Sequence, residues 1–318
     1  MFNTDLNHFL QQFDSPWLKF FMEFISALGA VPFVLAFILV ITFALNFRKG
    51  IVLVNIVAWT AMLTFIAKQT IDYPRPVDVD TTLISGDYNK VNHHLKPLLP
   101  DNFIDLLSEE VLGTTRSDQE VNYGFPSGHT SLQVALWLGM FFLFRKRWIL
   151  ALGISITVLT MLSRIYLAHH FLADVVGGLT LGMLVLGLLG ILVIRSRFFT
   201  QLSADFKSLT ILWLPILMTP FVKHVEVWLL GSLLGLNLAA TLIILHGNTL
   251  IFSRNTIKRI SPATFMIGLV FLTYYFSSNF DFGDNQFLQL FLITLFTFFI
   301  FRGAVTILKR VNFLSYKI

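Results

Sequence analysis

The sequence predicts an all-α fold, a polytopic bundle of transmembrane helices, from three observations. Hydrophobic residues fill 55% of the 318 positions and charged residues only 13%, whereas soluble domains carry about 25% charged residues. Apolar runs recur from residue 25 to residue 302, and a helix needs about 20 apolar residues to cross a bilayer. Lysine and arginine gather in every second connection between these runs. Together these features indicate a membrane protein.

We expect about nine membrane-spanning helices, because polar connections separate nine apolar segments. Several segments are shorter than about 20 residues, so one or two of them could be re-entrant. The predicted spans are residues 25–46, 51–71, 127–144, 148–163, 174–194, 209–222, 227–245, 263–278 and 286–303.

The basic residues predict the orientation, since cytoplasmic connections carry an excess of lysine and arginine. With nine spans, the N-terminus is then outside and the C-terminus is cytoplasmic. The net charge of +5 follows this topology, so we expect no nucleic-acid partner. The clusters are Arg48 with Lys49, Arg145 to Arg147, Arg195 with Arg197 and Lys207, Arg254 with Lys258 and Arg259, and Lys309 with Arg310.

Three segments are expected along the chain. In residues 1–24, apolar side chains from Leu6 to Trp17 recur at helical spacing, which favours an amphipathic helix on the outer membrane surface over a frayed end. Residues 25–194 form the predicted catalytic core, and residues 195–318 form additional transmembrane helices. Within the core, the loop 77–122 carries a net charge of −6. It is either a lid or entrance wall, or a solvated loop without a catalytic role.

The first of three polar stretches places Lys68 seven positions before Arg75. On a continuous helix this spacing puts both cations on one face. Pro74 and Pro76 are expected to break that helix at the outer interface and to stiffen the chain around Arg75. An ammonium and a forked guanidinium suit an oxyanion. The alternative is that both side chains extend to the lipid headgroups.

The second stretch is Pro126-Ser127-Gly128-His129, where an apolar run begins. Proline suits the first turn of a helix, and the free amides at a helix N-terminus bind anions. Gly128 leaves room for an oxyanion, and His129 faces the same place. Taken alone, the motif is also compatible with a simple helix cap.

The third stretch contains Arg164, His170 and Asp174. Histidine and aspartate at positions i and i+4 are neighbours on a helix face. A carboxylate that accepts one imidazole N–H leaves the other nitrogen free as a nucleophile. Such a pair is also common as a structural hydrogen bond. His169 lies five residues before Asp174, so we assign the nucleophile to His170. The absence of cysteine excludes thiol catalysis.

The order of the three stretches resembles the signature of the type 2 phosphatidic acid phosphatase family. That signature reads K-x6-R-P, then P-S-G-H, then S-R-x5-H-x3-D. Lys68 with Arg75 and Pro76, residues 126–129, and Ser163 and Arg164 with His170 and Asp174 match it in full. The resemblance covers roughly residues 51–194.

The resemblance implies a role for each matching residue. His170 would attack phosphorus, Asp174 would orient His170, and His129 would protonate the leaving oxygen and later activate water. The phosphoryl oxygens would be bound by five residues, namely Lys68, Arg75, Ser127, Gly128 and Arg164. No cofactor or metal is implied, because cations and amides supply the electrostatic stabilisation.

The expected substrate is a lipid phosphate or prenyl pyrophosphate, hydrolysed outside or in the periplasm by a protein of the bacterial inner membrane, in contact with membrane lipids. Haloperoxidases of the superfamily are soluble, unlike this chain. A glucose-6-phosphatase-like sugar phosphatase is the alternative, since that branch also has about nine helices. It typically lacks the carboxylate found here as Asp174. An alternative of another class is a phosphate-binding transporter or scaffold.

Overall fold

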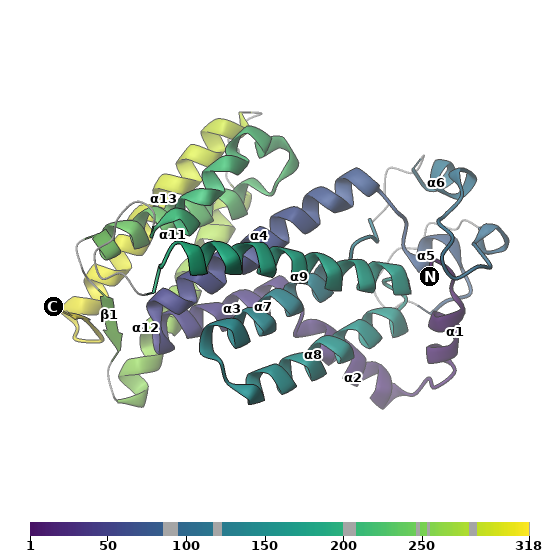
Figure 1. Cartoon of the computed structure of the whole chain (residues 1–318), viewed down its shortest axis with the longest axis horizontal. Coiled ribbons are helices and arrows are strands. Elements are labelled where there is room, and N and C mark those ends of the chain that lie inside the picture. The colour runs from purple at the N-terminus through teal and green to yellow at the C-terminus, as the bar shows by residue number, and fades with distance from the viewer. Residues whose placement is uncertain are drawn as a thin grey trace. The chain divides into compact units, whose positions relative to one another are not determined.

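The computed structural model describes residues 1–84, 95–116, 123–199, 208–245, 249–252, 255–279 and 285–317. They form helices and one antiparallel pair of short strands, so the predicted all-α class is correct for nearly all of them (Figure 1). The chain divides into two compact units. The first contains Met1–Phe33 and Leu63–Leu184, and the second contains Val34–Met62 and Val185–Ile318. All eight predicted site residues lie in the first unit.

The first unit carries the polar stretches at the ends of its helices. Its central helix α8 contacts α1, α2 and α7. Two glycines of α9 allow a close approach to α7. A Cβ at Gly178 would lie 2.4 Å from the carbonyl oxygen of Ser127, and one at Gly182 would lie 2.9 Å from that of Ser131. The helices of this unit are α1 (Asp5–Gln11), α2 (Pro16–Ala27), α5 (Pro76–Val79), η2 (Lys96–Leu98), α6 (Glu109–Arg116), α7 (Gly128–Phe144), α8 (Arg147–Tyr166), and the parts of α4 (Phe47–Ile71) and α9 (Leu172–Arg195) on its side of the division.

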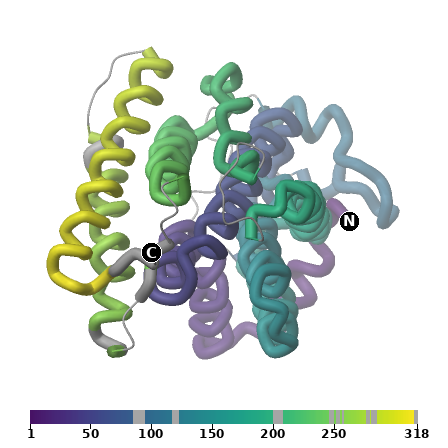
Figure 2. The backbone as a smooth tube through the Cα atoms, turned by 60° about the vertical axis from the view of Figure 1, so that its left-hand side comes forward, coloured from purple at the N-terminus to yellow at the C-terminus, as the bar shows by residue number. Residues whose placement is uncertain are grey.

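The second unit is organised around α11 (Val227–Leu245), which packs along α13 (Gln286–Arg310), the yellow helix of Figure 2. A Cβ at Gly235 would lie 2.4 Å from the carbonyl oxygen of Thr294, so glycine permits this contact. Asn55 and Asn237 exchange two buried amide hydrogen bonds of 3.0 and 2.8 Å. The other elements are α3 (Val31–Val40) from Val34 onward, the π-helical turn η1 (Ile41–Leu45), α10 (Thr210–Trp213), η3 (Leu214–His224), β1 (Thr249–Phe252), α12 (Thr256–Asn279), β2 (Leu314–Lys317) and the remaining parts of α4 and α9.

Among the described residues, five helical segments are long and apolar enough to cross a membrane, or six if the bent pair α2 and α3–η1 forms one span. They are Phe47–Val79, Arg147–Tyr166, Leu172–Arg195, Val227–Leu245 and Gln286–Arg310. Helix α7 is apolar but shorter, with 17 residues. The predicted span 209–222 instead forms the short helix α10 followed by the 3-10 helix η3, which contains Pro220. The count of nine spans stays a prediction.

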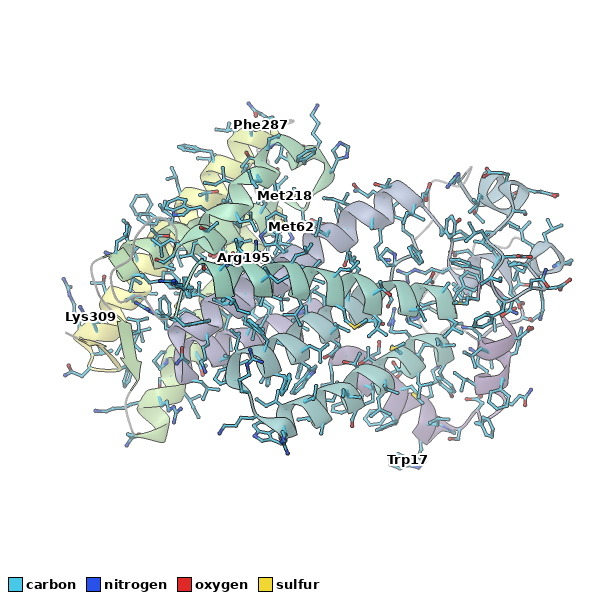
Figure 3. The ribbon with its side chains drawn as sticks, in the orientation of Figure 1. Trp17, Met62, Arg195, Met218, Phe287 and Lys309 are labelled. Carbon is cyan, nitrogen blue, oxygen red and sulfur yellow. The ribbon has the colours of Figure 1, made fainter. Side chains whose placement is uncertain are left out.

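The N-terminal part differs from the expected single amphipathic helix over residues 1–24. Helix α1 ends at Gln11, and α2 begins at Pro16 behind an extended Ser15, whose hydroxyl accepts from the amide of Leu18. A proline disfavours helical backbone at the residue before it, which explains the break at Ser15. Helix α2 then continues to Ala27 and meets α3–η1 at a bend of 55°, so the predicted span 25–46 is not a single straight helix. Trp17 projects from α2 and is 82% exposed (Figure 3).

The acidic loop 77–122 is partly described, since residues 85–94 and 117–122 lie outside the described residues. The described part of the loop is partly buried. Apolar side chains of the loop form a buried cluster with Phe2 and with residues at the start of α9. The loop contributes Val79, Leu95, Leu107, Val111 and Leu112, and the start of α9 contributes Phe171 and Ala173. Acidic side chains such as Glu109 and Glu110 remain exposed.

Candidate active site

The nucleophile predicted from the sequence lies in the turn between α8 and α9. Nδ1 of His170 is 3.2 Å from Oδ2 of Asp174, and both side chains are almost fully buried. The same Oδ2 accepts a hydrogen bond of 2.9 Å from the amide of Phe171. Because this carboxylate oxygen can only accept hydrogen bonds, the proton of the neutral imidazole is favoured on Nδ1, which donates it to Asp174. Nε2 then keeps its lone pair. The geometry therefore suits a histidine that attacks through Nε2.

The turn that carries His170 is short and tightly hydrogen-bonded. Helix α8 ends at Tyr166, and Ala168 adopts a left-handed backbone with φ of 54°. The amide of His169 donates to the carbonyl oxygen of Arg164 over 3.0 Å. Asp174 lies in the first turn of α9, while His170 precedes that helix. The expected i, i+4 contact thus forms across the helix start.

The second stretch forms the start of α7, with Ser127 as its N-cap and Gly128 as its first residue. Pro126 precedes the cap, so the expectation that it lies in the first turn was wrong. The amide of Ser127 donates to the carbonyl oxygen of Asp174 over 2.8 Å and joins this helix start to α9. The nearest neighbouring atom to a Cβ at Gly128 would be a methyl of Thr64 at 3.8 Å. The surrounding protein leaves space at Gly128, as an approaching oxyanion requires.

The helix of the first stretch breaks, as the prolines predicted, but it ends three residues before Pro74, so Lys68 and Arg75 do not share one helix face. Helix α4 ends at Ile71, Asp72 has a left-handed backbone with φ of 52°, and Pro74 lies outside any helix. Proline cannot continue the hydrogen-bonded helix, which accounts for the break. Arg75 instead caps the short helix α5, where its amide donates to Oδ2 of Asp78 over 2.9 Å.

Lys68 links the first stretch to the second. Its Nζ donates to the carbonyl oxygens of Tyr123 and Gly124 over 2.7 and 3.1 Å. The lysine is therefore directed toward the other polar stretches rather than extended to lipid headgroups. Gly124 is also in close contact with Pro74, because a Cβ there would lie 2.6 Å from the carbonyl oxygen of that residue.

The charges of all three stretches act on His170. Burial lowers its pKa well below the ordinary value, and Arg164, Lys68, Arg75 and His129 lower it further through their positive fields. The folded protein therefore keeps His170 neutral, as a nucleophile must be. Burial and the same kind of field, from Arg164, Arg75 and His129, lower the pKa of the neighbouring His169 to about 2. The structure thus brings the three predicted cations and both predicted histidines together.

Two further residues contact the site and were missed from the sequence. Oγ of Ser26 accepts a buried hydrogen bond of 2.7 Å from the guanidinium of Arg164. A Cβ at Gly29 would lie 3.0 Å from the ring of His129, so this glycine gives the histidine its space. Ser26 lies in the last turn of α2, and Gly29 lies in the link between α2 and α3. Their only signal in the sequence is that they are small residues within an apolar run.

The described residues contain no group of three or more His, Cys, Asp or Glu side chains placed to hold a metal ion. The charged side chains that act on His170 are the cations Arg164, Lys68 and Arg75, which suit a phosphoryl group.

Comparison with known proteins finds relatives of the part of the chain that carries these residues. Residues 49–198 match the model of the PAP2 superfamily, and they contain every predicted site residue. This part of the chain belongs to the PAP2 superfamily. The chain is similar to the phosphatidylglycerophosphatase B of Bacillus subtilis, with 25% identity over 183 residues, which cover 54% of this chain and 72% of that protein. It is also similar to the lipid A 4'-phosphatase of Porphyromonas gingivalis, with 36% identity over 63 residues, or 20% of this chain and 27% of that protein. No solved structure matches the chain.

Proposed function

We propose that this protein is an integral-membrane phosphatase that removes phosphate from a lipid phosphate or a prenyl pyrophosphate through a phosphohistidine intermediate. The observation that carries the proposal is the pairing of a buried, neutral His170 with Asp174 in the field of three cations. Membership of residues 49–198 in the PAP2 superfamily supports a phosphatase reaction.

In the first step, Nε2 of His170 forms a bond to phosphorus while the bond from phosphorus to the leaving oxygen breaks. His129, which takes up its proton when the anionic phosphoryl group binds beside it, donates that proton to the leaving oxygen, so a neutral alcohol or a lipid monophosphate departs. Asp174 holds the Nδ1 proton and stabilises the positive charge that develops on the imidazole ring. Lys68, Arg75 and Arg164 bind the phosphoryl oxygens, where negative charge is concentrated.

In the second step, His129 takes a proton from water, and the resulting hydroxide attacks phosphorus. The bond between phosphorus and Nε2 of His170 breaks, which releases inorganic phosphate and restores neutral His170. His129 is again protonated, so the cycle is balanced. First-turn amides of α7, which have no helical partner, offer donors to the same oxygens.

A lipid substrate is favoured over a soluble one for two reasons. The two relatives are named as phosphatases of lipids, phosphatidylglycerophosphate and lipid A. Asp174 is present, although the glucose-6-phosphatase-like branch typically lacks this carboxylate. A lipid would enter sideways between helices, with only its headgroup reaching the cations.

The membrane arrangement is part of the proposal. We place the site at the outer face of a bacterial inner membrane, with nine spans, an outer N-terminus and a cytoplasmic C-terminus. This topology follows from the alternation of basic clusters along the chain. A cysteine introduced at Glu109 and labelled from outside intact cells tests the orientation, and labelling only after cell lysis would contradict it.

The decisive experiment measures phosphate release by purified protein in detergent. The panel contains phosphatidate, phosphatidylglycerophosphate, undecaprenyl pyrophosphate and glucose 6-phosphate, with His170→Ala as the inactive control. We expect at least one lipid to be hydrolysed faster than the sugar phosphate, and every activity to be lost in the control. Preference for glucose 6-phosphate would support the sugar-phosphatase alternative. Phosphate binding without hydrolysis of any substrate would support a transporter or scaffold.

A further inference from the structure

Helix α1, which lies outside the family motifs, contacts the backbone of the catalytic turn. Nδ2 of Asn7 donates to the carbonyl oxygen of His170 over 3.2 Å and to that of Ile165 over 2.8 Å. One turn later on the same face, Nε2 of Gln11 donates to the carbonyl oxygen of Tyr166 over 2.9 Å. The last carbonyls of a helix lack partners within it. Asn7 and Gln11 therefore cap the end of α8, and Asn7 also binds the nucleophilic residue itself.

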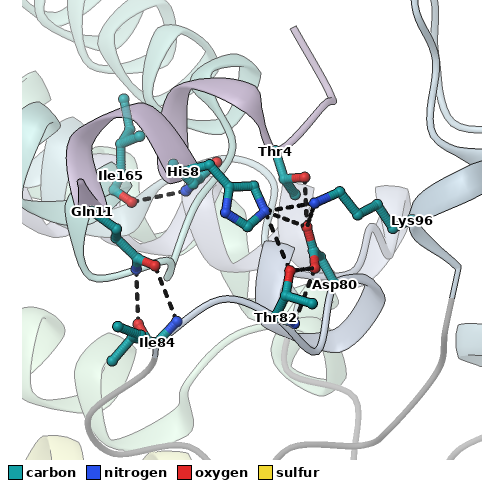
Figure 4. Close-up of polar contacts among 9 residues, drawn as sticks. Thr4, His8, Gln11, Asp80, Thr82, Ile84, Lys96 and Ile165 are labelled. Carbon is teal, nitrogen blue, oxygen red and sulfur yellow. Dashed lines mark hydrogen bonds and ion pairs between the residues drawn. The ribbon is translucent and has the colours of Figure 1, made fainter.

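The other face of α1 is anchored beside the first polar stretch (Figure 4). Asp80 lies directly after α5 and is only 1% exposed. It accepts hydrogen bonds of 2.8 Å from Thr4 and from His8, and Nζ of Lys96 is 3.1 Å away. Burial alone would raise the pKa of Asp80, but hydrogen bonds from Thr82, His8 and Thr4 outweigh it and lower the pKa. Asp80 therefore stays a carboxylate and holds α1 in place.

Phe2 adds a contact with all three stretches. Its buried ring lies 5.1 Å from the ring of Tyr73, 6.1 Å from that of Phe125 and 5.8 Å from that of Phe171. These three residues precede Pro74, follow Gly124 and follow His170, respectively. The N-terminal segment is thus packed against every part of the site, which limits the ways in which the catalytic turn can move.

The buried side chain of Asn7 is only partly satisfied by hydrogen bonds. Its side chain is fully buried, and Oδ1 has no hydrogen-bond partner among the described residues. Burying an unpaired acceptor costs about 1–3 kcal/mol. What the amide supplies is the pair of donors on Nδ2, one of which binds the nucleophilic residue.

We propose that Asn7 is a positioning residue that fixes the main chain of His170 so that Nε2 faces the phosphorus atom. The inference rests on the proposed function, in which His170 is the nucleophile. A displacement of about 1 Å in a reacting group can cost about a hundredfold in rate. Loss of the Asn7 donor therefore lowers the rate of phosphoryl transfer and leaves ground-state binding of the headgroup largely intact.

The test compares Asn7→Ala with Gln11→Ala, in full-length protein in detergent. Gln11 is the matched control, because it binds the neighbouring carbonyl of Tyr166 and does not contact His170. We expect Asn7→Ala to lower kcat at least about tenfold with KM changed less than about twofold, and Gln11→Ala to change both less than about twofold. Asn7→Leu, which keeps the number and branching of the side-chain heavy atoms without the donors, should match Asn7→Ala. Thermal unfolding shows whether each variant is folded.

Vanadate binding supplies a readout that does not depend on turnover. Vanadate bonded to His170 resembles the five-coordinate transition state, whereas inorganic phosphate is the product. By calorimetry, Asn7→Ala or Asn7→Leu should weaken vanadate binding at least about tenfold and phosphate binding less than about twofold. Equal weakening of both ligands, or equal effects of the Asn7 and Gln11 variants, would overturn the positioning role. If the wild-type protein hydrolysed no substrate, the proposed function would be refuted. The positioning role of Asn7 would still stand if the Asn7 variants bound vanadate more weakly than wild type and bound phosphate equally well.

Discussion

The ammonium group of Lys68 binds the carbonyl oxygen of Tyr123 over 2.7 Å, although the two residues are 55 positions apart in the chain. This hydrogen bond joins the end of α4 to the segment that leads into α7. It also means that Lys68 is preorganised toward the site before any phosphate arrives, which lowers the cost of ordering a long side chain on binding.

His170→Ala should abolish phosphate release, because a missing covalent nucleophile costs several orders of magnitude in kcat. His169→Ala should cost far less, since Asp174 orients His170. Initial rates on a lipid phosphate, with thermal unfolding as the control for folding, check both variants. If the His169 variant were inactive and the His170 variant active, the nucleophile would have to be assigned to His169.

Activity should be fully retained in EDTA. Lys68, Arg75 and Arg164 bring three positive charges to a phosphoryl group, so a divalent ion would add little. Phosphate release is measured before and after chelation, and again after magnesium is added. Loss on chelation and recovery with magnesium would contradict the mechanism.

Gly29→Ala should reduce kcat at least about tenfold, because the added Cβ would lie 3.0 Å from the ring of His129 and displace it. Gly187→Ala is the matched control, since a Cβ there would meet no atom within 4 Å. Steady-state kinetics on one lipid substrate compare the two variants. Equal effects would mean that the space beside His129 has no catalytic importance.

Neutralising Asp105, Glu109 and Glu110 should change lipid hydrolysis less than about threefold. The three side chains are exposed on the acidic loop, and a lipid headgroup that enters between helices need not cross their field. For glucose 6-phosphate at low salt, the same substitutions should raise the rate, because a negative loop repels a soluble anion. A triple variant without lipid activity would show that the loop takes part in substrate binding.

Stability should fall as the pH drops below about 6.5, the ordinary pKa of histidine in an unfolded chain. Burial keeps His169 and His170 unprotonated in the folded state, so over this range the unfolded state binds more protons. Each such histidine contributes a slope of about 1.4 kcal/mol per pH unit. Thermal unfolding of wild type and His169→Gln from pH 7.5 to pH 5 checks this, and parallel curves would contradict it.

The sequence predicted which charged residues lie together better than it predicted how they are held. Ionisable residues in an apolar chain are rare enough to identify Lys68, Arg75, Arg164 and the two histidines without coordinates. The contributions of Asn7, Ser26 and Gly29 were not predictable in this way. They act through a backbone carbonyl, a single hydroxyl and an absent side chain, and none of these creates a periodic pattern or a charge.

The helices show a similar division. Long apolar runs located α8, α9, α11 and α13 to within a few residues at most of their ends. The break after Ile71 and the bend between α2 and α3 depend on local backbone choices, which apolar periodicity does not record. The grouping of residues 34–62 with the C-terminal helices depends on packing between distant segments.

The main-chain hydrogen bond from Ser127 to Asp174 has a consequence for how such enzymes diverge. Its acceptor is a main-chain carbonyl, which every residue in a chain has, and its donor is a main-chain N–H, which only proline lacks. A descendant could therefore exchange the carboxylate at position 174 for another side chain and keep the two helix starts joined. The contact between the two helix starts does not depend on the side chain at position 174, so the carboxylate can be lost in evolution while the contact remains.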